Sequence, residues 1–404
     1  MANITLTNIP QTVVKWERDA KKNKIPNPYT ASIHDPDLTL LSGSKGGNEQ
    51  FFLCRTIWEP RMLGLPDCIP KKYLLEAKKI LSDPVRSRQW LAFLERINED
   101  PYKPLTISAS QELGKLALVL QALQYASQIT GTATIDGSKI DFSPIANRTR
   151  SQRRQSNPPR PETPTHSTST QADPARPLDS DDSDVEMDDF SSFMASPVVQ
   201  HSPVAGELAK LEGPARSEQE MVITSTILQR AVCMGAGASQ VEITADQEAF
   251  RARSGNQPLY TARVDGVMRN AAIKFIALWT ETKRSHRYCE PDAAAIKGQE
   301  TFQLFAKVSG QPDEYLQKLK EDGTNETECW LAMNIHEFFF QRASFPPGWV
   351  AYTQGVKGDK FAIAKVKETG PFIWHDRESM SDLGILILAL ALQETDRQKK
   401  IPRR

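Results

Sequence analysis

The stretch from Tyr260 to Lys283 constrains the fold of this 404-residue chain more than any other. Residues 260–265 alternate between apolar and polar side chains, which predicts a half-buried β-strand. A turn is predicted at Arg269-Asn270, and residues 271–279 are then apolar except for one lysine. Such a run is typical of a central strand that is buried on both faces. The chain must therefore build a sheet whose faces are covered by other elements.

Three ionisable side chains gather at one end of this predicted strand pair. Asp265 ends the first strand, and Glu281 and Lys283 end the second. Because side chains alternate along a strand, Glu281 and Lys283 point to the same face. Burying such charges costs free energy unless another charge compensates them, and a divalent cation is a common solution. The spacing therefore predicts a cation site at this end of the sheet.

Asp265 followed by Glu281-x-Lys283 resembles the core of the PD-(D/E)XK nuclease superfamily. More narrowly, residues from about Ser217 to Gln393 resemble fungal nuclease-like proteins, although the family's Pro before the Asp is Val264 here. The resemblance implies an α/β (α+β), restriction-endonuclease-like domain over residues 206–396. Its central mixed sheet is expected to be flanked by helices.

The resemblance also implies a chemistry. Asp265 and Glu281 would hold Mg²⁺ or Mn²⁺, with the backbone carbonyl of Thr282 as a further ligand. Lys283 would orient the attacking water and stabilise negative charge on the phosphate. The implied function is hydrolysis of phosphodiester bonds in a nucleic acid.

Two further groups are expected near the cation. The helix predicted at 293–308 would present a glutamine toward the site, for which Gln299 fits better than Gln303. The first helix of the superfamily often carries a carboxylate, here Glu220, which is also spaced to form a capping box with Ser217. Both the metal-ligand and the capping role of Glu220 stay open.

An arginine-rich loop follows the predicted Glu-x-Lys strand. Arg284 and Arg287 lie just beyond Lys283. Because the guanidinium group donates a pair of hydrogen bonds to phosphate oxygens, these two arginines are predicted to contact phosphate. A solvated loop without a binding role is the alternative.

Residues 1–142 are predicted to form a mostly helical N-terminal region. Helices are expected at 71–81, 85–98 and 108–129, and residues 49–58 form either a strand or a short buried helix. The region contains no catalytic arrangement of side chains. It is expected to serve packing or partner binding.

Residues 143–205 are predicted to be a disordered linker, because Ser, Pro and charged residues dominate and aromatic residues are nearly absent. An arginine cluster at 148–154 is a candidate nuclear-import signal, and an acidic serine-containing run at 179–189 is a candidate phosphorylation and docking segment. The tail at 397–404 is basic. A nuclear or cytoplasmic location and nuclear protein partners are therefore expected.

The remaining C-terminal residues are predicted to add strands and a helix. Residues 329–341 and 348–354 are expected to pair as antiparallel strands, and 361–366 to form another. His336 is expected to be structural. An almost wholly apolar helix ending near Gln393 is expected to pack against the sheet.

Composition excludes several classes of protein. Acidic and basic residues balance at 50 each, so no global positive charge indicates a nucleic-acid partner. Five scattered cysteines without paired spacing argue against a disulfide framework or a zinc site. The N-terminus lacks the apolar core of a signal peptide, and the apolar run at 383–392 is too short to span a membrane. We expect an intracellular protein with no membrane segment.

Three functions remain open from the sequence. The first is a metal-dependent nuclease. The second is a nuclease-like binding or scaffold protein without catalysis, which the neutral net charge and the missing proline favour. In the third, Glu281 and Lys283 are an ordinary ion pair at a strand end, and the chain is a nuclear adaptor.

Overall fold

The computed structural model describes residues 4–6, 9–62, 65–66, 69–130, 203–235, 237–238, 240–272, 274–283, 287–288, 292–311, 326–334, 337–356 and 361–399. Most of the predicted linker lies outside these residues; its last three residues begin a helix. The first three residues of the predicted tail belong to the last helix, and the others lie outside the described ranges. Met1–Asp136 and Arg216–Arg404 form one compact unit, and Gly137–Ala215 a second, of which 203–215 are described.

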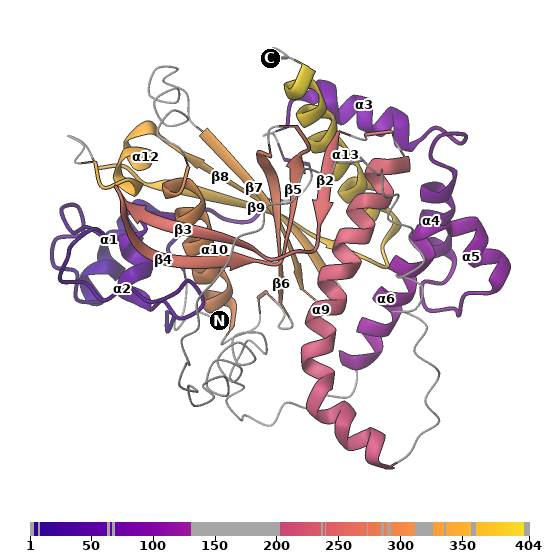
Figure 1. Ribbon diagram of the computed structural model, residues 1–404, viewed down its shortest axis with the longest axis horizontal. Helices are drawn as coiled ribbons and strands as arrows, with labels where there is room; N and C mark the ends of the chain where they lie inside the picture. The colour runs from indigo at the N-terminus through magenta and orange to yellow at the C-terminus, as the bar shows by residue number, and fades with distance from the viewer. Residues whose placement is uncertain are drawn as a thin grey trace, which may run out of the picture. The chain divides into compact units, whose positions relative to one another are not determined.

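A seven-stranded mixed sheet lies at the centre of the first unit (Figure 1). Its strand order is β1-β9-β8-β7-β6-β5-β2, in which β6 and β7 are parallel, as are β1 and β9, and the other neighbours are antiparallel. The strands are β1 (Thr56–Trp58), β2 (Val241–Thr244), β5 (Gly266–Asn270), β6 (Ile276–Lys283), β7 (Glu326–Asn334), β8 (Glu337–Phe345) and β9 (Ala364–Ile373). The expected mixed sheet flanked by helices is confirmed.

The remaining two described strands form a separate antiparallel ribbon. They are β3 (Glu248–Ser254) and β4 (Gln257–Val264). Tyr260, predicted to lie in a strand paired with 271–279, therefore lies in a strand paired with β3 instead. The predicted second strand is shorter than expected, since β5 precedes a turn and β6 begins at Ile276.

Alternation along the strands separates two hydrophobic cores on opposite faces of the sheet. Trp279 and Trp330 point to one face, where their rings stack with centroids 4.8 Å apart. Leu278 and Leu331, one position along, point to the other face. We call these the α10 side and the α13 side, after the helices α10 (Asp292–Ser309) and α13 (Arg377–Lys399).

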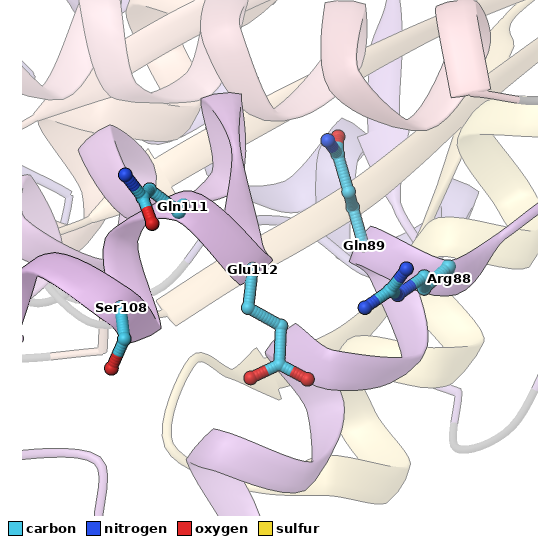
Figure 2. A pocket seen from close by; sticks show the side chains of 5 residues that line it. All are labelled: Arg88, Gln89, Ser108, Gln111 and Glu112. Carbon is cyan, nitrogen blue, oxygen red and sulfur yellow. The ribbon is translucent and has the colours of Figure 1, made fainter.

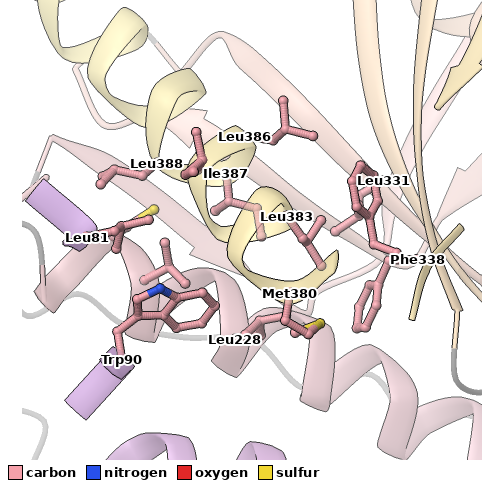
Figure 3. Close-up of a cluster of buried hydrophobic side chains, with 14 of the residues drawn as sticks. Leu81, Trp90, Leu228, Leu331, Phe338, Met380, Leu383, Leu386, Ile387 and Leu388 are labelled. Carbon is pink, nitrogen blue, oxygen red and sulfur yellow. The ribbon is translucent and has the colours of Figure 1, made fainter. Parts of the chain in front are cut away.

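The other described helices also divide between the two sides. α1 (Val13–Lys22), α2 (Asn48–Leu53) and α12 (Pro347–Thr353) contribute to the core of the α10 side, together with the ribbon. α3 (Lys71–Leu81), α4 (Arg88–Glu99), α6 (Lys115–Thr130) and α9 (Pro203–Gly235) contribute to the core of the α13 side, and α5 (Ile107–Leu113) adds Leu113 to it. Figure 3 shows Trp90 of α4 close to the apolar side chains of α13.

The N-terminal residues are part of the sheet-centred unit rather than a separate helical region. β1 pairs in parallel with β9, and the Trp58 indole donates a hydrogen bond to Thr301 Oγ1 on α10 at 3.0 Å. On the other face, α3 and α4 pack against α13. Each sheet face uses N-terminal residues to complete its core; the sequence had left open whether this region folds alone or packs on the C-terminal domain.

Two further expectations differ from the observed elements. Residues 348–354, predicted to be a strand, lie mainly in α12, because Pro346 and Pro347 begin a helix there; β7 pairs with β8 instead. The helix predicted at 108–129 is divided into α5 and α6 at Gly114, which adopts a φ of +55°. A Cβ at Gly114 would lie 2.3 Å from Gln89 Nε2.

We expect Gly384→Ala to destabilise the protein by about 1–3 kcal/mol, because a Cβ there would lie 2.4 Å from the Trp90 ring. Without that contact the same change in a helix would stabilise by up to about 1 kcal/mol, so the sign of the effect tests whether α4 packs on α13. Urea unfolding measures it. Gly235→Ala is the control: a Cβ there meets no atom within 4 Å, so the change should be neutral or stabilise the helix by up to about 1 kcal/mol.

Candidate functional site

Asp265 lies at the break between the ribbon and the sheet. Its carboxylate oxygen Oδ2 accepts hydrogen bonds from Thr282 N at 2.8 Å and Thr282 Oγ1 at 2.9 Å, and its own amide donates to Thr280 O at 2.9 Å. Its other oxygen, Oδ1, accepts no hydrogen bond from the part of the chain that the structure describes. The next residue must be small, because a Cβ on Gly266 would lie 2.8 Å from Thr244 O. The fold therefore fixes Asp265 against β6 and leaves one carboxylate oxygen available.

Glu281 is buried in β6 on the α10 side of the sheet. Its Oε1 accepts a hydrogen bond from Gln299 Nε2 at 2.7 Å and also contacts the Lys283 ammonium group. Its Oε2 accepts a hydrogen bond from Gln303 Nε2 at 2.6 Å. The predicted side chains Glu281, Lys283 and Gln299 thus meet in one cluster.

Gln303 donates a hydrogen bond to Glu281 just as Gln299 does, although the sequence favoured Gln299. Gln299 and Gln303 are one helical turn apart on α10, so both face the same strand. Besides Glu281, Gln303 Nε2 donates to the backbone oxygen of Arg263 at 2.6 Å. It therefore joins β4 to β6 beside Asp265. The four-residue spacing was visible in the sequence, but it supported either glutamine.

Burial dominates the electrostatics of Glu281. The pKa of this carboxyl group is raised to about 8, chiefly by loss of hydration and in part by the nearby Asp265, against the opposing effects of Lys283 and of the hydrogen bond from Gln303. A carboxyl group with a raised pKa holds its proton near neutral pH. A second positive charge beside Glu281 would favour its ionised form.

Two of the three groups predicted to hold a cation, Glu281 and the Thr282 carbonyl, contact the ammonium group of Lys283. Lys283 Nζ donates to Thr282 O at 3.1 Å as well as to Glu281. Together with the available oxygen of Asp265, these are hard oxygen donors of the kind that Mg²⁺ and Mn²⁺ prefer. Within the described residues no three His, Cys, Asp or Glu side chains form a cluster, so the fit rests on two carboxylates and one carbonyl.

Arg287 is not placed to bind phosphate as predicted. Its guanidinium group is fully buried, and it forms ion pairs with Glu300 of α10 and Glu368 of β9. Gln341 Nε2 and the Tyr288 hydroxyl also donate to Glu368. The donors of Arg287 are therefore used inside the protein. The sequence could not show this, because Glu368 lies 81 residues further along the chain.

The structure does not test the predicted binding roles of the other two residues, Arg284 and Glu220. Arg284 lies outside the described residues. Glu220 lies in α9, which packs on the α13 side, and its backbone oxygen accepts a hydrogen bond from Thr224 Oγ1 at 2.6 Å. Its predicted cap with Ser217 is wrong, because α9 begins at Pro203. Its role as a metal ligand stays a prediction.

A hollow between α4 and α5 is separate from this cluster (Figure 2). Its lining side chains are those of Arg88, Gln89, Ser108, Gln111 and Glu112. These helices carry none of the predicted site residues. We therefore assign the candidate site to the end of β6 alone.

Comparison with known proteins adds no family to this description. No family model, curated protein or solved structure matches the chain. Within the described ranges, no helix is long and apolar enough to cross a lipid bilayer.

We expect Glu281→Gln to change how stability depends on pH. A group whose pKa is raised on folding binds its proton more tightly in the folded state, so the wild type loses stability as pH rises from about 5 to 8. The Glu281→Gln variant lacks this loss. Its free energy of unfolding should therefore increase relative to that of the wild type by roughly 1 kcal/mol per pH unit.

Urea unfolding between pH 5 and 9 measures this difference. The control is Glu242→Gln. A hydrogen bond from Lys274 lowers the pKa of Glu242, so this carboxyl group is ionised in both the folded and the unfolded protein across this pH range. A constant difference between wild type and Glu281→Gln across the range would contradict the raised pKa.

Removal of Arg287 should destabilise the protein strongly. Arg287→Met would leave Glu300 and Glu368 buried without a positive partner, and we expect a loss of about 3–5 kcal/mol in the free energy of unfolding. The triple variant Arg287→Met, Glu300→Gln, Glu368→Gln removes all three charges and should recover most of the loss. Thermal and urea unfolding of the two variants give the comparison.

Proposed function

We propose that this chain is a metal-dependent nuclease that hydrolyses phosphodiester bonds at Asp265, Glu281 and Lys283. The observation that carries the proposal is the meeting of Glu281, Lys283 and Gln299 at one end of β6, where Asp265 accepts hydrogen bonds from the intervening Thr282. The order of elements also agrees with the resemblance. A helix comes first, Asp265 precedes the Glu-x-Lys strand, and the following helix presents glutamine toward it.

Asp265, Glu281 and the Thr282 carbonyl would hold Mg²⁺ or Mn²⁺. When bound, the metal ion supplies a water of lowered pKa and neutralises charge on the phosphate. Glu281 would release its proton as it becomes a ligand, since its burial keeps it protonated otherwise.

Lys283 would act on the attacking water and on the phosphate. With a cation bound at Glu281, the ammonium group of Lys283 would no longer be the positive group that contacts this carboxyl group. It can donate hydrogen bonds to the attacking water and to the phosphate oxygens as negative charge develops on them. Gln299 and Gln303 hold the Glu281 carboxylate in place through separate oxygens.

A scaffold without catalysis is the second candidate. It is favoured by the raised pKa of Glu281, because a protonated carboxyl group near pH 7 is a poor metal ligand. In this case the cluster would stabilise the fold, and the protein would act through its partners.

Asp265→Asn tests the proposal while keeping a side-chain oxygen to accept the hydrogen bonds of Thr282. We expect heat of Mg²⁺ and Mn²⁺ binding to the full chain at pH 8 in the wild type and its loss in the variant. Cleavage of plasmid DNA and of RNA should fall by about 100-fold or more.

Asp246→Ala, which removes an exposed carboxylate from the β2–β3 turn, is the matched control and should leave both signals unchanged. Absence of cation binding and of cleavage in the wild type would reject the nuclease and favour the scaffold.

A further inference from the structure

The ribbon formed by β3 and β4, labelled in Figure 1, has side chains of different chemistry on its two faces. One face is buried and apolar, and packs toward α10 through Phe250, Ala252, Tyr260, Ala262 and Val264. The exposed positions between them include Arg251, Arg253 and Arg263. The other exposed residues of the two strands are Ala249, Gln257, Pro258 and Thr261, and none of them carries a charge. We call these three arginines the arginine face.

The arginine face has an unbalanced charge in a chain whose net charge is zero. Two cations close to the ribbon are paired with carboxylates, Arg269 with Glu248 and Lys274 with Glu242. None of the three arginines of the arginine face has a carboxylate partner within the described part of the chain. Unpaired guanidinium groups on one exposed face form a surface that attracts anions.

The arginine face leads directly to the candidate site. Thr261 and Arg263 occupy alternate positions on one side of β4, and Asp265 directly follows the end of this strand at Val264. The backbone oxygen of Arg263 is held by Gln303, which also donates to Glu281. Arg263 is therefore linked to the buried carboxylate through a single side chain.

The spacing of the arginines suits an extended ligand. With a rise of about 3.4 Å per residue, Arg263 lies roughly 7 Å from Asp265 along β4. Arg251 pairs with Thr261, which lies about 14 Å from Asp265 along the strand. Arg253 pairs with Pro258, which lies about 24 Å from Asp265. A single small anion could not contact all three, whereas a chain of phosphates could.

The far end of this series borders a hollow in the surface. Arg251 and Arg253 line it together with Gly310 and Gln311, at the end of α10. α10 approaches β3 closely there, since a Cβ on Gly310 would lie 2.9 Å from Arg251 O. A backbone that follows the arginine face would thus reach a concave surface.

We propose that the arginine face binds the sugar-phosphate backbone of a polynucleotide and guides it to the site at Asp265 and Glu281. The inference rests on the proposed nuclease function and names its substrate class as a polymer rather than a nucleotide. Arginine suits this task because its planar group donates paired hydrogen bonds to phosphate. A two-stranded ribbon also fits the major groove of a duplex.

The test is binding of the full chain to a fluorescein-labelled 20-base-pair DNA duplex, followed by anisotropy in EDTA over a range of salt concentrations. Each phosphate contact contributes about 0.9 to the slope of log K against log salt. Changing Arg251, Arg253 and Arg263 to Ala should therefore lower the slope by up to about 2.7 and weaken binding at least tenfold at low salt.

Two further variants separate charge from other effects. Lysine at the same three positions keeps the charge and should retain most of the slope. A control that removes Lys79, Arg86 and Arg88, three exposed cations around α3 and α4, should bind as the wild type does. A thermal melt of each variant verifies that it is folded. A single-stranded 20-mer and an RNA duplex, used as further probes, show which polymer is preferred.

Because EDTA removes any metal ion, the outcome is independent of catalysis. Equal slopes for the wild type and the alanine variant, an equal loss in the control, or no binding by the wild type would each overturn the arginine face as a nucleic-acid surface. Cation binding that Asp265→Asn abolishes would still support the metal site in those cases. Loss of the slope with the alanine variant alone supports the inference.

Discussion

The burial of one carboxyl group, that of Glu281, is the constraint on which this end of the molecule depends. A charged oxygen in a core requires donors, and here they come from α10 and from the neighbouring lysine in the same strand. To supply them, α10 must cross the sheet with two glutamines facing β6. The same glutamine that satisfies the carboxyl group also holds the end of β4. The helix, the ribbon and the sheet therefore share one polar junction.

The elements that could be predicted from the sequence are those that depend on interactions between residues close together in the chain. The helix expected at 71–81 is observed with the same bounds, and the Glu-x-Lys pair lies on one face of a strand as its spacing requires. Features that depend on residues far apart in the sequence could not be predicted. The burial of Arg287 depends on Glu300 and Glu368, which nothing in its own loop reveals. Likewise, the pairing of β1 with β9 leaves no periodic signal in a strand of three residues.

The two faces of the sheet differ in the polarity of the side chains that they bury. The α13 side is mainly apolar, with buried polar groups such as Gln229 and Asn270 hydrogen-bonded within it, and Trp90 and Gly384 meet there at close range. The α10 side combines stacked tryptophans with buried charges at Glu281 and Arg287. Charged groups in a core are compensated one by one, which restricts the residues that can replace them. Chemistry is therefore expected on the α10 side and stability on the other.

The parallel pairing of β1 with β9 also has a consequence for biosynthesis. Thr56 meets Ala364, roughly 300 residues later in the chain. At about 5–20 residues per second, a ribosome needs about 15–60 s to make the partner of β1. During that interval the aromatic side chains of Phe51, Phe52 and Trp58 have no sheet to cover. The nascent N-terminus is therefore expected to need a chaperone until the last strand emerges.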